Sequence, residues 1–329
     1  MTTRIIKPTK PNIERAAGII KDGGVVAFPT ETVYGLGADA YNADAVKKIF
    51  TAKGRPADNP LIVHCADAGM MSGVVQKIPP DAERLLKRFA PGPLTLVLEK
   101  NPKIPDIVTA GLQTVAVRIP ASKPALELIR AAGTPIAAPS ANASGRPSPT
   151  TAQHVYDDLN GRTPLILDGG GCNVGIESTV LDFTCGVPVI LRRGGLSAEI
   201  LSEALGIKIE ASKNAGDAPK SPGMKYRHYA PSCTVETFGT GNPGAIIERY
   251  DECLQKNMKP AIITLGYRAA LFGERNAIKL GNNANDAAHK LFTAFRAAET
   301  EYDILLCEEL PGGGLGAAVN DRMRRSAVK

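Results

Sequence analysis

Residues 25–37 read VVAFPTETVYGLG, an apolar run followed by a polar turn. The first four residues lie between a pair of glycines and a proline, which predicts a short buried strand. Thr30, Glu31 and Thr32 then place two hydroxyls and a carboxylate where this strand ends. The glycines within residues 34–37 would let the backbone pass close to whatever those side chains hold.

A basic turn lies between a predicted helix at 44–52 and a predicted strand at 61–63. Its sequence, KGRPADNP, places Lys53 and Arg55 two residues apart on a backbone stiffened by glycine and proline. A guanidinium can hold two phosphate oxygens and an ammonium supplies a mobile point charge, so this pair suits an anion. Spacing alone leaves a solvated basic loop as the alternative. The strand ends at His64, beside this turn.

Two further segments extend the candidate site. A strand predicted over 114–120 places Thr114 and Arg118 on one face, because side chains alternate along a strand. A strand predicted over 136–138 leads into Pro-Ser-Ala-Asn, where small residues leave backbone amides accessible to a phosphate. A plain turn is the alternative for this second segment.

Composition restricts the class of protein. A chain of 329 residues predicts two domains, and 43% hydrophobic with 22% charged residues is typical of a globular protein. No apolar run approaches about 18 residues and the N-terminus lacks the core of a signal peptide, so we expect a cytoplasmic protein without a membrane association. The absence of Trp argues against a stacking platform for single-stranded nucleic acid. The net charge of +6 suits phosphate-bearing ligands.

Several common sites are excluded by their missing motifs. The cysteines form no C-x-x-C pair and are interpreted as reduced, mostly packed thiols. The four histidines show no metal-ligand spacing, and no G-x-S-x-G elbow occurs. The glycine patterns at 35–40 and 312–316 are weak matches to a dinucleotide fingerprint, and a Walker A motif is absent. If ATP binds, scattered cations and amides must hold it.

The C-terminal part alternates strands and helices. Strands are predicted around 235 and at 261–264, 278–280 and 303–308, and helices at 242–256, 284–300 and 316–326. Such alternation predicts a parallel sheet with helices outside, similar to a Rossmann fold.

The full set of motifs resembles a known family. PTETVYGLG and KGRPADNPLIVH are followed by APGPLT at 90–95, VAVRIP at 115–120, APSANASG at 138–145, ESTV at 177–180 and LRRG at 191–194. This pattern resembles the YrdC-like family, whose members are threonylcarbamoyl-AMP synthases. SPGMKYRHYAP at 221–231 and the C-terminal segment resemble the long, two-domain form with a Sua-type C-terminal domain.

The resemblance implies an α/β protein in two domains. Residues 1–207 would form a YrdC-like catalytic domain with a twisted mixed sheet and a basic concave cleft. Residues 208–232 would form a linker with a lid motif, and residues 233–329 a smaller Rossmann-like domain.

The implied reaction converts L-threonine, bicarbonate and ATP into threonylcarbamoyl-AMP and pyrophosphate, as a nucleotidyltransferase. The product would pass to the tRNA threonylcarbamoyl transferase machinery, and tRNA would not be required for this step. Mg²⁺ would enter bound to ATP, without a metal site made by the protein.

The resemblance also implies the roles of single residues. Lys53 and Arg55 would be catalytic. L-threonine would contact Thr32, His64, Arg118, Ala138 and Ser178. ATP would contact Lys53, Arg55, Asn59, Thr114, Ser140, Asn142, Ser148, Arg192 and Tyr229. Tyr226, Arg227 and Tyr229 would close over the site and exclude water.

Two other functions remain open on the sequence. The first part of the chain could bind RNA without catalytic turnover, which salt-sensitive binding would reveal. The C-terminal part could serve a dinucleotide-dependent oxidoreductase, which NAD binding would reveal.

Overall fold

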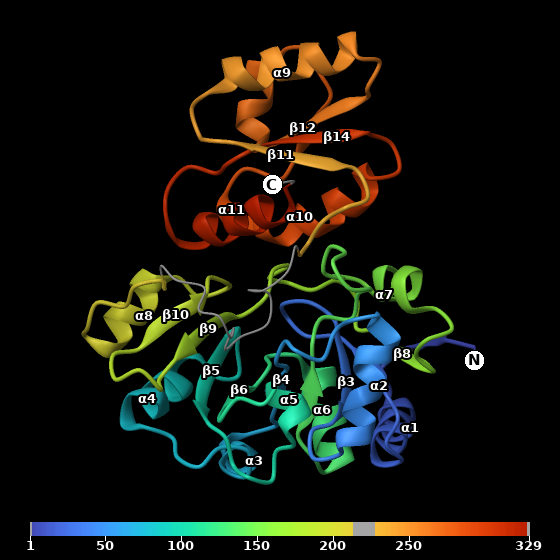
Figure 1. Ribbon diagram of the computed structural model, residues 1–329, viewed down its shortest axis with the longest axis vertical. Coiled ribbons are helices and arrows are strands. Elements are labelled where there is room, and N and C mark those ends of the chain that lie inside the picture. Colours follow the sequence, from blue (N-terminus) through green and yellow to red (C-terminus); the bar gives the residue numbers. More distant parts are fainter. Residues whose placement is uncertain (1, 213–227, 328–329) are drawn as a thin grey trace. The chain divides into compact units, whose positions relative to one another are not determined.

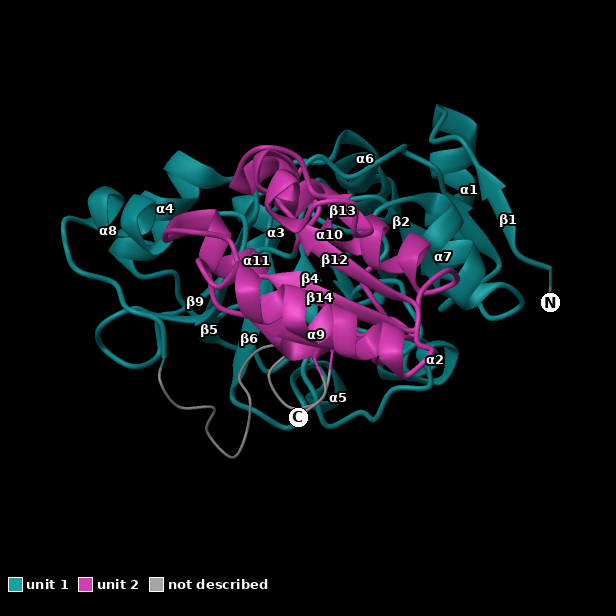
Figure 2. Cartoon of the chain, turned by 90° about the horizontal axis from the view of Figure 1, so that it is seen from above, with its two compact units in different colours: residues 1–144, 149–173, 177–226 teal, residues 145–148, 174–176, 227–329 magenta. Residues whose placement is uncertain are grey.

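The structure is a computed structural model that describes residues 2–212 and 228–327. The chain divides into two compact units, coloured separately in Figure 2. The first comprises residues 1–144, 149–173 and 177–226, and the second residues 145–148, 174–176 and 227–329. Most of the predicted lid, residues 221–227, lies outside the described residues. No helix in the described ranges is long and apolar enough to span a bilayer.

The first unit is built on one large mixed sheet (Figure 1). Its strands are β1 (Arg4–Ile6), β2 (Val26–Phe28), β3 (Gly35–Asp39), β4 (Ile62–His64), β5 (Leu94–Glu99), β6 (Thr114–Arg118), β7 (Ile136–Ala138), β8 (Leu165–Leu167), β9 (Thr179–Asp182) and β10 (Val189–Arg192). Their order across the sheet is β1-β8-β2-β3-β7-β4-β6-β5-β9-β10. Both parallel and antiparallel pairs occur, which confirms the predicted mixed sheet.

Eight helices among the described residues accompany this sheet. They are α1 (Lys10–Lys21), α2 (Ala43–Lys53), α3 (Ala68–Ser72), α4 (Pro80–Phe89), α5 (Asp106–Thr109), α6 (Lys123–Ala132), α7 (Ala152–Leu159) and α8 (Ala198–Leu205). The main core lies on one face, where α2, α4, α7 and α8 bury their apolar sides against the strands. On the opposite face α1 and α6 pack against β2, β7 and β8. The rest of that face, over β4, β5, β6 and β9, carries a small apolar cluster instead.

The segment expected to bring its backbone close to a ligand is instead a strand of the sheet. β3 pairs antiparallel with both β2 and β7. A Cβ on Gly37 would lie 2.5 Å from Ile136 Cγ2 and 2.7 Å from Phe28 Cε1. The glycine therefore makes room for neighbouring side chains of the same sheet face, and the interpretation of Gly37 as a point of ligand approach was wrong.

Replacement of Gly37 by alanine should destabilise the protein by about 1–3 kcal/mol, because the added methyl overpacks a closed core. The matched control is Gly18→Ala on α1, where an added Cβ meets nothing within 4 Å. That change should be neutral or stabilising, since alanine favours a helix over glycine by roughly 0.5–1 kcal/mol. Urea unfolding of both variants measures the difference. Equal stability of the two variants would contradict the close packing around β3.

Two short segments extend the sheet. After α3 the chain leaves the helix, and Val75 pairs antiparallel with Lys100, directly after β5. Gln76 N donates to Glu99 O at 3.0 Å, which ties this segment to the sheet. β1 was not predicted, because it is a short strand of three residues at the sheet edge, parallel to β8.

The second unit contains a smaller sheet with strand order β11-β14-β12-β13. Its strands are β11 (Thr234–Phe238), β12 (Pro260–Thr264), β13 (Ala277–Lys279) and β14 (Ile304–Glu308), with helices α9 (Pro243–Gln255), α10 (Ala284–Ala298) and α11 (Gly314–Ser326) and the 3₁₀ helix η1 (Gly266–Phe272). All strand pairs are parallel. Figure 1 shows α9 on one face of the sheet and α10 and α11 on the other. This arrangement confirms the predicted Rossmann-like layout.

Candidate functional site

The face of the large sheet opposite the main core brings polar side chains together by register. His64 on β4 is the partner of Arg118 on β6, and Arg118 is the partner of Thr95 on β5. Because side chains alternate along a strand, these three lie on the same face. Ile62, Ala116, Val97 and Val180 form a small apolar cluster on this face. The site therefore has an apolar floor with a polar row beside it.

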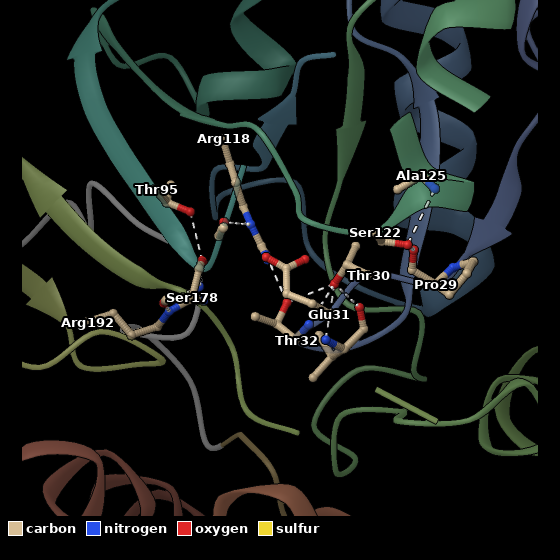
Figure 3. Close-up of polar contacts among 12 residues, drawn as sticks. Pro29, Thr30, Glu31, Thr32, Thr95, Arg118, Ser122, Ala125, Ser178 and Arg192 are labelled. Atoms are coloured by element: carbon tan, nitrogen blue, oxygen red, sulfur yellow. Dashed lines mark hydrogen bonds and ion pairs between the residues drawn. The ribbon is translucent and has the colours of Figure 1, made fainter. Parts of the chain in front are cut away.

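The polar turn after β2 lies beside this row (Figure 3). Thr30 Oγ1 accepts hydrogen bonds from the backbone N–H groups of Thr32 and Val33, both at 3.2 Å, and lies 2.8 Å from Thr32 Oγ1. Ser122 Oγ, at the start of α6, donates to Pro29 O at 2.8 Å. The turn is thus held both internally and by a helix end, which fixes the direction of its side chains.

Arg118 is the centre of this turn's contacts. Its Nη1 donates to Thr32 Oγ1 at 2.9 Å, and its Nε donates to Gly92 O at 3.2 Å. Its Nη2 lies 2.7 Å from Glu31 Oε1, an ion pair between side chains only 4% and 9% exposed. Figure 3 shows the guanidinium and the carboxylate facing each other. A buried guanidinium fixed in this way is suited to a carboxylate or phosphate ligand.

At the Thr95 end of the row, two hydroxyl groups lie beside a second arginine. Thr95 Oγ1 and Ser178 Oγ, which precedes β9, are 2.7 Å apart. Arg192 at the end of β10 donates from Nη2 to Ser178 Oγ at 3.1 Å, and from Nε and Nη2 to Ser178 O. Arg192 is itself buried. A second guanidinium is therefore fixed near the same face.

Lys53, the last residue of α2, lies in the interior. Its Nζ donates to Ser140 O and Asn142 O, both at 2.5 Å, and Asn142 Oδ1 is 3.4 Å away. Ser144 N donates to Lys53 O at 2.9 Å. The helix ends here because Gly54 adopts a left-handed conformation with φ 61°. The lysine thus joins the basic turn to the Ser-Ala-Asn loop after β7.

Arg55 and Asn59 form the rest of the basic turn. Arg55 Nη2 donates to Asn59 O at 3.0 Å, and its guanidinium lies 6.0 Å from the centre of the Phe50 ring. The Asn59 amide is completely buried, and neither its Oδ1 nor its Nδ2 has a hydrogen-bond partner within the described ranges. Thr114 Oγ1 is likewise buried without a partner there. Buried polar groups are normally hydrogen-bonded, so these two indicate a polar ligand.

His64 is a neutral side chain in this site. Burial, and next the positive charge of Arg118, lower the pKa of His64 from 6.5 to about 3. Its Nδ1 lies 3.2 Å from Ile62 O, and its ring packs edge-on against Phe28 with centroids 5.8 Å apart. With Nδ1 donating to that carbonyl, Nε2 is left as an acceptor.

The lowered pKa of His64 predicts a loss of stability in acid. Because the folded state disfavours the proton, the contribution of neutral His64 is complete above pH 6.5 and falls as the pH drops toward 3. The expected slope is up to about 1.4 kcal/mol per pH unit. Urea unfolding from pH 7.5 to 4.5 should show a shallower acid loss for His64→Gln than for the unchanged protein. The control His289→Gln removes an exposed histidine and should lose stability in acid as steeply as the unchanged protein. An equally shallow acid loss in the control would contradict the prediction. So would an acid loss in His64→Gln as steep as that of the unchanged protein.

The remaining predicted residues lie in different places. Ala138 on β7 is the partner of Ile62, so it adjoins the apolar floor. Ser148 and Tyr229 belong to the second unit, where the Tyr229 ring stacks on Phe292 at 5.4 Å and lies under Arg322. Their contacts with ATP stay predictions. The closing role predicted for Tyr226 and Arg227 stays a prediction as well, because both residues lie outside the described residues.

Three side chains of the site had no predicted role. Thr30 and Glu31 were noted only as polar residues at a strand end, and Thr95 was part of the APGPLT motif. The structure places Glu31 against Arg118 and Thr95 against Ser178. The strand alternation that paired Thr114 with Arg118 carried no information on these, because it does not reveal which strands are neighbours.

The arrangement favours binding and alignment of anions over covalent catalysis. No group of three or more His, Cys, Asp or Glu side chains with metal-site geometry occurs in the described part of the chain. All six cysteines are free thiols. Burial, and next the charge of Glu31, raise the pKa of Cys172 to about 12, so this thiol stays protonated.

Two family models match consecutive parts of the chain. The Sua5/YciO/YrdC model, described as telomere recombination, matches residues 18–194. The model for the C-terminal domain of threonylcarbamoyl-AMP synthase matches residues 196–328.

Curated relatives match almost the full length. Threonylcarbamoyl-AMP synthase of Pyrococcus abyssi is 46% identical over 323 residues, which cover 96% of this chain and 94% of the relative. The Bacillus subtilis protein of the same name is 44% identical, covering 96% and 93%. The crystal structure of P. abyssi Sua5 complexed with L-threonine has a TM-score of 0.91 at 44% identity, covering 99% of this chain and 97% of that one.

Proposed function

This chain belongs to the Sua5/YciO/YrdC family and is similar over its whole length to threonylcarbamoyl-AMP synthases, and from this premise we propose its reaction and the roles of its residues. The reaction joins L-threonine, bicarbonate and ATP into threonylcarbamoyl-AMP and pyrophosphate, which makes the protein a nucleotidyltransferase. The observation that carries the proposal is the buried row of His64, Arg118 and Thr95 on the sheet face opposite the main core.

We place the amino acid over the apolar floor, the cluster formed by Ile62, Val97, Ala116 and Val180. Arg118 takes the threonine carboxylate, with the neutral His64 and the hydroxyls of Thr32 and Ser178 available to its polar groups. A charge-assisted contact of this kind contributes roughly 1.5–3 kcal/mol. Ala138 closes one side, where its small side chain leaves room for a methyl group.

We place the nucleotide at the basic turn and the Ser-Ala-Asn loop. Lys53 and Arg55 neutralise the phosphates, and the unpartnered groups of Asn59 and Thr114 accept or donate the remaining hydrogen bonds. Ser140, Asn142, Ser148, Arg192 and Tyr229 complete the proposed ATP contacts. Mg²⁺ would arrive on the triphosphate, whose charge it neutralises, with phosphate and water as its ligands.

The chemistry requires alignment more than a protein nucleophile. Carboxylation of the threonine amine gives a carbamate, whose oxygen attacks the α-phosphorus and displaces pyrophosphate. Fixed cations stabilise the charge that develops on the phosphoryl oxygens, and the buried site keeps the oxygen and the phosphorus aligned. Exclusion of water protects both the carbamate and the mixed anhydride from hydrolysis.

Pyrophosphate release tests the function. The purified protein should release pyrophosphate from ATP only when both threonine and bicarbonate are present, with no RNA added. Salt-sensitive RNA binding without any release would instead support the RNA-binding alternative. We further propose that the protein works in the cytoplasm, where free thiols stay reduced, and passes its product to a tRNA-modifying transferase.

A further inference from the structure

The carboxylate of Glu31 is the most unusual polar group of the site. Its side chain is 9% exposed, and neither Oε1 nor Oε2 has a hydrogen-bond partner within the described ranges. Oε1 lies 2.7 Å from Arg118 Nη2, close enough for an ion pair although the angle is not that of a hydrogen bond. Figure 3 shows this carboxylate directed toward the guanidinium.

A structural role does not account for this geometry. A buried ion pair offsets the loss of hydration only when hydrogen bonds satisfy the remaining lone pairs. Glu31 makes the close approach but leaves both oxygens without such bonds, whereas Thr30 and Thr32 in the same turn are well bonded. The carboxylate is therefore placed for a donor that comes from a ligand.

The Arg118–Glu31 pair matches the charges of a free amino acid. The carboxylate and the ammonium of an amino acid are bonded to the same carbon. When the carboxylate contacts the Arg118 guanidinium, the ammonium falls within reach of an anion placed 2.7 Å from that guanidinium. One side chain of each sign then faces one group of each sign, so neither Arg118 nor Glu31 is left with an uncompensated charge.

We propose that Glu31 binds the α-ammonium of threonine and accepts its proton, as the general base of the carboxylation step; this rests on the proposed function. The threonine ammonium gives one proton to the Glu31 carboxylate and becomes a neutral amine. The amine nitrogen then bonds to the bicarbonate carbon. The C–OH bond of bicarbonate breaks, and the departing hydroxide takes the second amine proton and leaves as water. The carbamate retains one N–H and carries one negative charge.

His64 is the other basic group beside this site, and it is poorly suited to the same role. Burial and Arg118 keep its pKa near 3, since a proton on it would place a second positive charge beside the guanidinium. Glu31 is instead the carboxylate that lies against Arg118, where the ammonium of a ligand can reach it. His64 instead remains a neutral acceptor for a hydroxyl or amine proton.

Substitution of Glu31 by glutamine tests the proposal by its pH profile. The full chain with Glu31→Gln should form threonylcarbamoyl-AMP about 10²–10⁴-fold more slowly at pH 7, as expected for loss of a general base. Its rate should then rise about tenfold per pH unit, because only solution can supply the neutral amine. The unchanged protein and the matched control Glu99→Gln, at an exposed position, should show little pH dependence over the same range.

The reverse reaction separates a base from a positioning role. Formation of ATP from threonylcarbamoyl-AMP and pyrophosphate begins with adenylyl transfer and needs no amine deprotonation. Glu31→Gln should therefore retain this activity within about threefold of the unchanged protein, a much smaller effect than loss of a base gives. Equal losses in both directions, or a forward loss that does not change with pH, would overturn the proposal.

If Glu31→Gln does not fold, the variant Glu31→Asp tests the proposal instead. Glu31→Asp keeps a carboxylate, so its rate of threonylcarbamoyl-AMP formation should be moderately lower than that of the unchanged protein and should not change with pH. A rate that rises with pH in this variant would also overturn the proposal. If the unchanged protein neither makes threonylcarbamoyl-AMP nor forms ATP from it, the proposed function itself fails and the role of Glu31 falls with it.

Discussion

Replacement of Lys53 by methionine is expected to lower the rate of threonylcarbamoyl-AMP formation by about 10²–10³-fold, as for loss of a fixed transition-state contact. Methionine keeps the length of the side chain but removes its charge. Lys53 joins the end of α2 to Ser140 and Asn142, so the change also releases the loop proposed to hold the phosphates. Pyrophosphate release at saturating ATP and threonine measures the effect.

The matched control is Lys47→Met on the same helix, where the ammonium is exposed and pairs with Asp44. That variant should retain full activity, since an exposed pair of this kind contributes little. Thermal unfolding of both variants shows whether the chain still folds. A folded Lys53→Met protein with unchanged turnover would contradict the placement of ATP at the basic turn.

Replacement of Arg118 by lysine is expected to raise the KM for threonine by roughly 10–200-fold, which corresponds to about 1.5–3 kcal/mol for a lost charge-assisted contact. Lysine keeps a positive charge near Glu31 but cannot contact Thr32, Gly92 and a ligand carboxylate at once. The KM for ATP should stay within about threefold, because Arg118 is assigned to the amino acid alone.

Arg130→Lys, at an exposed position on α6, is the control for the same chemical change. It should alter neither KM. Steady-state kinetics with each substrate varied in turn distinguish the outcomes. An increase in the KM for ATP equal to that for threonine would show that Arg118 does not bind the amino acid specifically.

Much of the fold could be predicted because the elements have strong local signals. The strand before the polar turn and the helix before Lys53 are bounded by glycine and proline, and both occur within a residue or two of the expected positions. The parallel sheet of the second unit followed from its alternation of strands and helices. The strand at Gly35–Asp39 was missed, because its glycines serve close packing against Phe28 and Ile136 that only the sheet order reveals.

The candidate site was only partly accessible from the sequence. The family resemblance brought Lys53, Arg118 and Ser178 into one hypothesis. The structure places Arg118 and Ser178 around one sheet face, and Lys53 against the loop that follows β7. The role of Glu31 could not be inferred in this way. Its significance depends on burial, on two unpartnered oxygens and on a distance to Arg118, none of which a linear pattern contains.

A crystal structure of this protein with L-threonine and a non-hydrolysable ATP analogue tests the central claim most directly. The account predicts the threonine carboxylate on Arg118, its ammonium against Glu31, and the phosphates beside Lys53 and Arg55. Well-occupied ligands bound elsewhere on the chain, or threonine bound with its carboxylate away from Arg118, would contradict it.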